Sequence, residues 1–230
     1  MKLRNKFLVP VSLAVLFAGV AAYLLISLSM RRQGEEFQAR ATTIMNESIS
    51  DYADSQVASY QMILEKITDN AVQQAALFAR TPAIVECYEL ALTGDIDDPA
   101  DPTVQQARGM LRERVAPIYN SFVETTGMES FRLHFHLPNS RSFMRSWRKG
   151  WNALVGGEQV DVSDDLSSFR FTVNEVNQPP HRAVRGIEVG RGGFVIRGVL
   201  PVMSSEGGHL GSLEVYFDFS EVMDHLRGNS

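Results

Sequence analysis

Residues 131–143 read Phe131-Arg132-Leu133-His134-Phe135-His136-Leu137-Pro138-Asn139-Ser140-Arg141-Ser142-Phe143. Apolar residues at the odd positions up to 137 alternate with Arg132, His134 and His136. A period of two predicts a β-strand with one apolar face and one polar face. Because imidazole and guanidinium groups share the polar face, that face suits a polar or anionic small molecule better than a hydrophobic core.

The period of two continues beyond this stretch towards the end of the chain. Strands are predicted over 130–137, 141–148, 183–189, 193–202 and 209–219. The last three are joined by connections short enough only for antiparallel hairpins. A loop-rich excursion over roughly 149–182 separates the second strand from the third. Helical patterns come before the sheet, so the predicted fold class is α+β.

Composition excludes some classes of function. The chain has 230 residues and a formal net charge of −5, which does not predict a basic surface for nucleic acid. Its single cysteine, Cys87, rules out a framework of internal disulfides and is interpreted as a small buried apolar residue.

An uncharged apolar stretch lies close to the N-terminus. Residues 7–30 carry no charge and are long enough to cross a bilayer as a helix. A cleaved signal peptide is the alternative, but its apolar region would be shorter. Because basic residues precede the stretch, we expect residues 1–6 in the cytoplasm and the bulk of the chain in the periplasm, anchored in a bacterial inner membrane.

A long amphipathic helix is predicted after the anchor. From Glu35 to Arg80 there is no proline, and apolar residues recur three or four positions apart. We interpret residues 31–80 as a stalk whose helix also pairs with a second copy to form a homodimer. The alternative is that this helix packs along its own domain. Shorter helices are predicted over 82–92 and 103–125, and Pro117 should bend or cut the second one. The remainder, 81–230, is expected to be one α/β sensor module.

Several stretches resemble the Cache sensor domains of bacterial chemoreceptors and histidine kinases, and most closely the double-Cache type. They are residues 132–138, 141–145, 164–170, 185–193, 196–202 and 210–214. The resemblance implies a PAS-like antiparallel sheet that holds a small molecule, and a helix that passes the signal through the membrane. Receptors of this type continue into a second module, a second span and a signalling region, so we expect this chain to be a fragment of a longer receptor.

The candidate ligand-binding residues gather on the polar face and the turns beside it. They are Arg132, His134, His136, Arg141, Arg145, Trp147, Asp165 and Arg170. Guanidinium groups are well suited to hold a carboxylate or phosphate, although surface salt bridges to the acidic 161–165 loop are the alternative for the arginines. Trp147 is interpreted as a pocket wall or as plain core. The roles of Asp165 and Arg170 are implied by the resemblance, because in the family this loop closes over the ligand.

His134 and His136 also raise the question of a metal. Two residues apart on a strand, they point the same way, a geometry that zinc can use. His181, His209 or Asp165 could supply a third ligand, but no spacing motif selects one, so we predict neither a metal nor a cofactor. No catalytic motif is found, and the chain is predicted not to be an enzyme. A membrane-anchored metal-dependent enzyme and a purely structural periplasmic module are the competing hypotheses.

Overall fold

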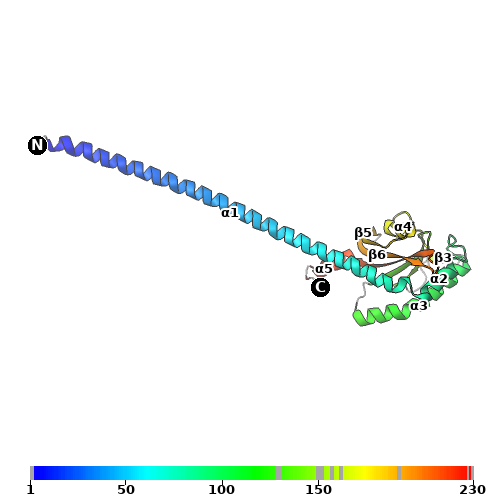
Figure 1. Ribbon diagram of the computed structural model, residues 1–230. Coiled ribbons are helices and arrows are strands. Elements are labelled where there is room, and N and C mark those ends of the chain that lie inside the picture. The colour runs from blue at the N-terminus through cyan, green and yellow to red at the C-terminus, as the bar shows by residue number, and fades with distance from the viewer. Residues whose placement is uncertain are drawn as a thin grey trace. The chain divides into compact units, whose positions relative to one another are not determined.

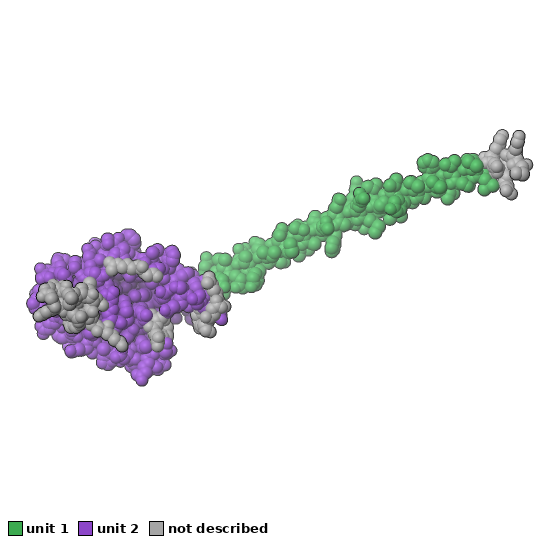
Figure 2. All heavy atoms as spheres, turned by 180° about the vertical axis from the view of Figure 1, so that it is seen from behind, with its two compact units in different colours: residues 1–61 green, residues 62–230 purple. Residues whose placement is uncertain are grey.

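The computed structural model describes residues 3–127, 131–148, 153–155, 158–160, 163–190, 193–226 and 228. The chain forms two compact units, Met1–Gln61 and Met62–Ser230, which Figure 2 colours green and purple. Part of the predicted excursion over 149–182 lies outside the described residues. Where it is described, it contains two short strands, β3 (Ala153–Val155) and β4 (Glu158–Val160), and helix α4 (Phe171–Asn177).

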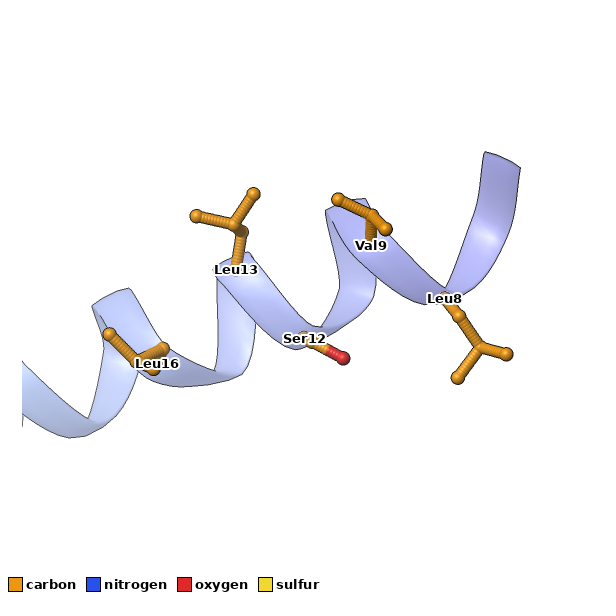
Figure 3. A pocket seen from close by; sticks show the side chains of 5 residues that line it. All are labelled: Leu8, Val9, Ser12, Leu13 and Leu16. Atoms are coloured by element: carbon orange, nitrogen blue, oxygen red, sulfur yellow. The ribbon is translucent and has the colours of Figure 1, made fainter. Parts of the chain in front are cut away.

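Helix α1 (Leu3–Ala79) contains all described residues of the first unit and continues into the second unit. Its N-terminal part is long and apolar enough to cross a membrane, and none of that apolar stretch is buried. Figure 3 shows a hollow on this exposed surface, lined by Leu8, Val9, Ser12, Leu13 and Leu16. A single helix forms all of it, and lipid chains would fill such a surface in a bilayer.

Two further helices precede the sheet. Pro82 occupies the first turn of α2 (Pro82–Ala91), where its missing N–H costs nothing. The Asp101 side chain caps α3 (Pro102–Thr126) by accepting hydrogen bonds from the backbone N–H groups of Thr103 and Val104, both at 2.9 Å. Pro117 was predicted to bend this helix or to cut it in two. It does not cut α3, which continues to a left-handed cap at Gly127.

The five predicted strands form one antiparallel sheet in the order β2-β1-β7-β6-β5. Their bounds are β1 (Arg132–His136), β2 (Ser142–Arg145), β5 (Val184–Gly190), β6 (Gly193–Met203) and β7 (His209–Asp218). Strand β1, from the opening stretch, pairs with β7, the last strand of the chain. The predicted α+β class and antiparallel sheet are therefore confirmed.

The apolar face of the sheet packs on the end of α1 and on α2 and α3, which lie together on one side of the strands in Figure 1. Contact with α1 is close at Gly198, where an added Cβ would lie 2.5 Å from the backbone nitrogen of Val72. Glycine is therefore required on β6 for the helix and the strand to approach each other. The buried sheet residues on this side include Leu133, Phe135, Leu213, Val215 and Phe217.

Helix α4 covers part of the opposite face, where Val173 and Val176 pack against Val199 of β6. In Figure 1, α4 and helices α2 and α3 lie on opposite sides of the strands. Helix α5 (Phe219–Leu226) follows β7. Polar side chains on this face of the central strands, among them His134, Arg197 and Glu214, are buried rather than solvated.

Candidate functional site

Three side chains that can bind protons or metals meet at the centre of the polar face. His134 and His136 come from β1, and Glu214 comes from β7 directly opposite His134. Their exposed fractions are 1%, 0% and 0%. The period of two places all three on the same face, and the antiparallel register brings the carboxylate to the imidazoles.

The facing atoms of these three residues lie close together. His134 Nδ1 is 3.1 Å from Glu214 Oε1 and 3.1 Å from His136 Nε2. His136 Nε2 is 3.5 Å from the same carboxylate oxygen. We call His134, His136 and Glu214 the buried triad. The sequence suggested His181, His209 or Asp165 as a partner for the two histidines, whereas within the described residues the group that joins them is Glu214.

Each member of the triad is held from behind by another buried side chain. His134 Nε2 lies 2.8 Å from the Ser142 hydroxyl, and His136 Nδ1 lies 3.3 Å from the Ser212 hydroxyl. Arg197 donates a 2.7 Å hydrogen bond to the second carboxylate oxygen, Glu214 Oε2. These contacts fix the orientation of both rings and of the carboxylate.

The surroundings also set the protonation states of the triad. Burial lowers the pKa of His134 well below its usual value, and the positive charge of Arg145 adds to the effect. Burial likewise lowers the pKa of His136, against the opposing influence of Glu214. Burial would raise the pKa of Glu214, but Arg197 and hydrogen bonds from both histidines hold it well below its usual range. Two neutral imidazoles therefore face an ionised carboxylate at neutral pH.

Three arginines surround the triad, and each carries buried N–H groups without a hydrogen-bond partner among the described residues. These atoms are Arg145 Nη1, Arg170 Nε and Nη1, and Arg197 Nε and Nη2. Arg145 forms a 2.7 Å ion pair with Asp164, and Arg197 lies 3.2 Å from Glu188. Burial lowers the pKa of Arg170, while Glu214 acts in the opposite direction. Buried donors without acceptors are costly, so this face has unused capacity for an anion.

Aromatic rings close one side of this cluster. The Trp147 ring meets His134 edge-on, with centroids 5.8 Å apart, and meets Tyr216 in the same way at 5.5 Å. The guanidinium carbon of Arg132 lies 6.0 Å from the Trp147 centroid. Trp147 therefore contacts His134 of the triad directly, and its role as a pocket wall stays a prediction.

Two predicted residues lie together at the outer edge of the sheet. Arg141 pairs through its backbone with Asp165, beyond strand β2. The Asp165 carboxylate accepts a hydrogen bond from the Ser167 backbone N–H at 2.9 Å. In the described part of the chain, no hydrogen bond or ion pair joins Arg141 or Asp165 to the buried triad. The sequence alone thus grouped residues that the sheet places at two different sites.

Sequence reasoning missed Glu214 and Arg197 as site residues. The signal for Glu214 was present, because Ser212, Glu214 and Tyr216 alternate with the apolar Leu213, Val215 and Phe217. Arg197 interrupts the apolar stretch of β6 between Ile196 and Val199. A charged residue within a strand otherwise predicted to be buried was the usable clue.

Comparison with known proteins identifies similar domains. Residues 47–230 match the sequence profile of a family described as the double sensory domain of two-component sensor kinases. A search of curated protein sequences found no significant match.

Among solved structures, the chain is similar to the sensor domain of the Vibrio cholerae histidine kinase DctB, with a TM-score of 0.52 and 10% identity over 76% of this chain and 58% of that one. The chain thus spans a little over half of the DctB structure. The Escherichia coli DcuS sensor domain aligns with a TM-score of 0.45 and 10% identity over 72% of this chain and 98% of that one.

Proposed function

Because the chain belongs to the family of double sensory domains of two-component sensor kinases, we propose that it is the periplasmic ligand-binding part of a transmembrane receptor. The Cache-type resemblance read from the sequence is confirmed by this membership. The receptor would be a histidine kinase or a chemoreceptor. In this proposal the chain binds and transmits, and performs no catalysis of its own.

The proposed ligand is a small anion held over the polar face of the sheet. The observation that supports it is the set of buried N–H groups on Arg145, Arg170 and Arg197 that have no partner among the described residues. A carboxylate or phosphate accepts hydrogen bonds from guanidinium groups in a matched, often bidentate geometry. Arg170 is the best placed of the three, since it makes no ion pair with any described residue.

Transmission is proposed to run through β6 into α1. Arg197 faces the polar side of the sheet, and the next residue, Gly198, contacts the backbone of α1 at Ala71 and Val72 on the other side. A ligand that binds better to one of two positions of β6 would shift α1 relative to the sheet. Because α1 continues without a break to the apolar N-terminal stretch, such a shift could pass along the helix.

The membrane arrangement is part of the same proposal. Residues 7–30 would anchor the chain once in a bacterial inner membrane, with 1–6 in the cytoplasm and the rest in the periplasm. Apolar side chains remain exposed along the part of α1 proposed as the stalk, 31–80, and a second copy of the helix would cover them in a homodimer. They include Phe37, Ile44, Met45, Ile49 and Tyr52. The sensor module proper is then 81–230.

Thermal unfolding of the full chain in detergent micelles tests ligand binding. The chain is screened with small carboxylates, amino acids and phosphorylated compounds, all after treatment with a chelator. A ligand present at one hundred times its Kd should stabilise the protein by about 2.7 kcal/mol.

Arg170→Met should weaken binding of an anionic hit at least tenfold, because it removes the charge without breaking an ion pair to a described residue. Arg185→Met is the matched control, since its ion pair with Asp69 is solvent-exposed. If no compound of any class stabilises the protein, the proposal of a small-molecule sensor is wrong.

A further inference from the structure

The buried triad also has the composition and spacing of a metal centre. Two imidazole nitrogens and one carboxylate oxygen are the donor set of the two-histidine, one-carboxylate sites that bind divalent transition metals. His134 Nδ1, His136 Nε2 and Glu214 Oε1 are separated by 3.1, 3.1 and 3.5 Å. Metal–ligand bonds of about 2.0–2.2 Å at angles between tetrahedral and octahedral values place donor atoms about 2.9–3.5 Å apart. One ion can therefore contact all three atoms without rearrangement of the strands.

The contacts behind the triad match the needs of a metal ligand as well. A metal would take the place of the protons that both histidines donate to Glu214 in the metal-free protein. With Ser142 accepting from His134 Nε2–H and Ser212 accepting from His136 Nδ1–H, the two nitrogens that face Glu214 carry lone pairs instead. In that tautomer three acceptor atoms lie within 3.5 Å of one another, and a cation between them is a partner that all three can bind. Arg197 holds the other oxygen of Glu214, so Oε1 is the oxygen that faces the two imidazoles and would face an ion.

From this geometry we infer that His134, His136 and Glu214 bind one divalent first-row transition-metal ion. This departs from the prediction of no metal, which was made without a third ligand. Three protein donors leave coordination positions open, and the proposed anion would occupy them. The anion is the one part of this inference that rests on the proposed function. Its negative charge would offset the repulsion between the metal ion and the nearby arginines.

Co²⁺ titration of the chelator-treated full chain in micelles tests the inference. Ligand-field absorption and calorimetry are recorded in chloride buffer and again with acetate present as a simple carboxylate. We expect one Co²⁺ per chain, displaced by Zn²⁺, in at least one of the two buffers. X-ray absorption of the wild-type complex should identify two imidazoles and one carboxylate as ligands.

The variants Glu214→Gln and His136→Gln should each weaken Co²⁺ binding at least tenfold, and circular dichroism checks that they remain folded. His209→Gln is the matched control, because it removes a histidine of the same unit that lies outside the triad. Absence of stoichiometric binding in both buffers, or X-ray absorption without two imidazoles, overturns the inference whether or not the variants fold.

The two proposals fail separately. An anion that stabilises the chelator-treated protein, together with no Co²⁺ binding, removes the metal and leaves the sensor proposal standing. Stoichiometric Co²⁺ binding, with no response to any anion either before or after Co²⁺ is added, supports the metal site and removes the anion site.

Discussion

Replacing Gly198 with alanine should destabilise the sensor unit by separating α1 from the sheet. The new Cβ would lie 2.5 Å from the backbone nitrogen of Val72 and 2.8 Å from the carbonyl carbon of Ala71. Relief to an ordinary contact near 3.4 Å requires a displacement of about 0.9 Å, and backbone atoms of a helix cannot rotate away as a side chain can. Ala71 and, one turn further along α1, Ala75 are fully buried in the core, so the displacement also loosens the core.

The expected loss of unfolding free energy is about 1–3 kcal/mol, the usual cost of overpacking a close contact. Urea denaturation of the full chain in micelles, followed by tryptophan fluorescence, measures it, since Trp147 and Trp151 both belong to the second unit. Gly109→Ala is the control, because its Cβ would meet open space on α3, and it should gain up to about 1 kcal/mol. A Gly198→Ala protein as stable as the wild type would refute the close contact of α1 and β6.

Three further predictions concern the unfolding free energy, measured in the same way. Arg197→Met should cost about 3–5 kcal/mol because it leaves the Glu214 charge buried without its 2.7 Å partner. Arg185→Met breaks only an exposed pair and should cost less than about 1 kcal/mol. Equal costs for the two variants would contradict the burial of the Glu214 charge. Tyr88→Phe should cost about 1 kcal/mol by removing the 2.8 Å hydrogen bond to the Ser212 carbonyl, and no loss would contradict that bond. Burial and the charge of His181 lower the pKa of His209 to about 4, so the unfolded chain binds more protons and stability falls as the pH drops from about 6.5 to 4. Between pH 7 and pH 4.5, His209→Gln should lose less unfolding free energy than the wild type. The difference should be a fraction of about 3 kcal/mol, because the His209 ring is only partly buried. An equal loss in both proteins would refute this role of His209.

Much of the local structure followed from the sequence because it depends on neighbours along the chain. The alternation around His134 predicted β1, and Pro82 and Gly127 marked a helix start and a helix end that the structure contains. Pro117 was less reliable, because buried residues before it and the partly buried Tyr119 and Phe122 after it hold the helix against the core despite the loss of one backbone N–H.

The candidate site was only half visible in the sequence. His134, His136, Arg145, Trp147 and Arg170 do gather near one another on the polar face or at its rim. Arg141 and Asp165 form a backbone bridge just outside β2 and lie apart from the triad, whereas Ser142 within β2 contacts His134. Which residues of this segment reach the triad depends on the irregular register between β1 and β2, which no local pattern predicts.

By itself the sequence determined the five strands of the main sheet, the helices before it and the polar face of each strand, since these depend on the spacing of residues within a segment; β3, β4, α4 and α5 were not predicted. Only the tertiary structure decided that β7 lies beside β1. That pairing brings Glu214 to within 3.5 Å of His134 and His136, about 80 residues earlier in the chain. A contact between distant segments depends on register and strand order, and no local pattern encodes either.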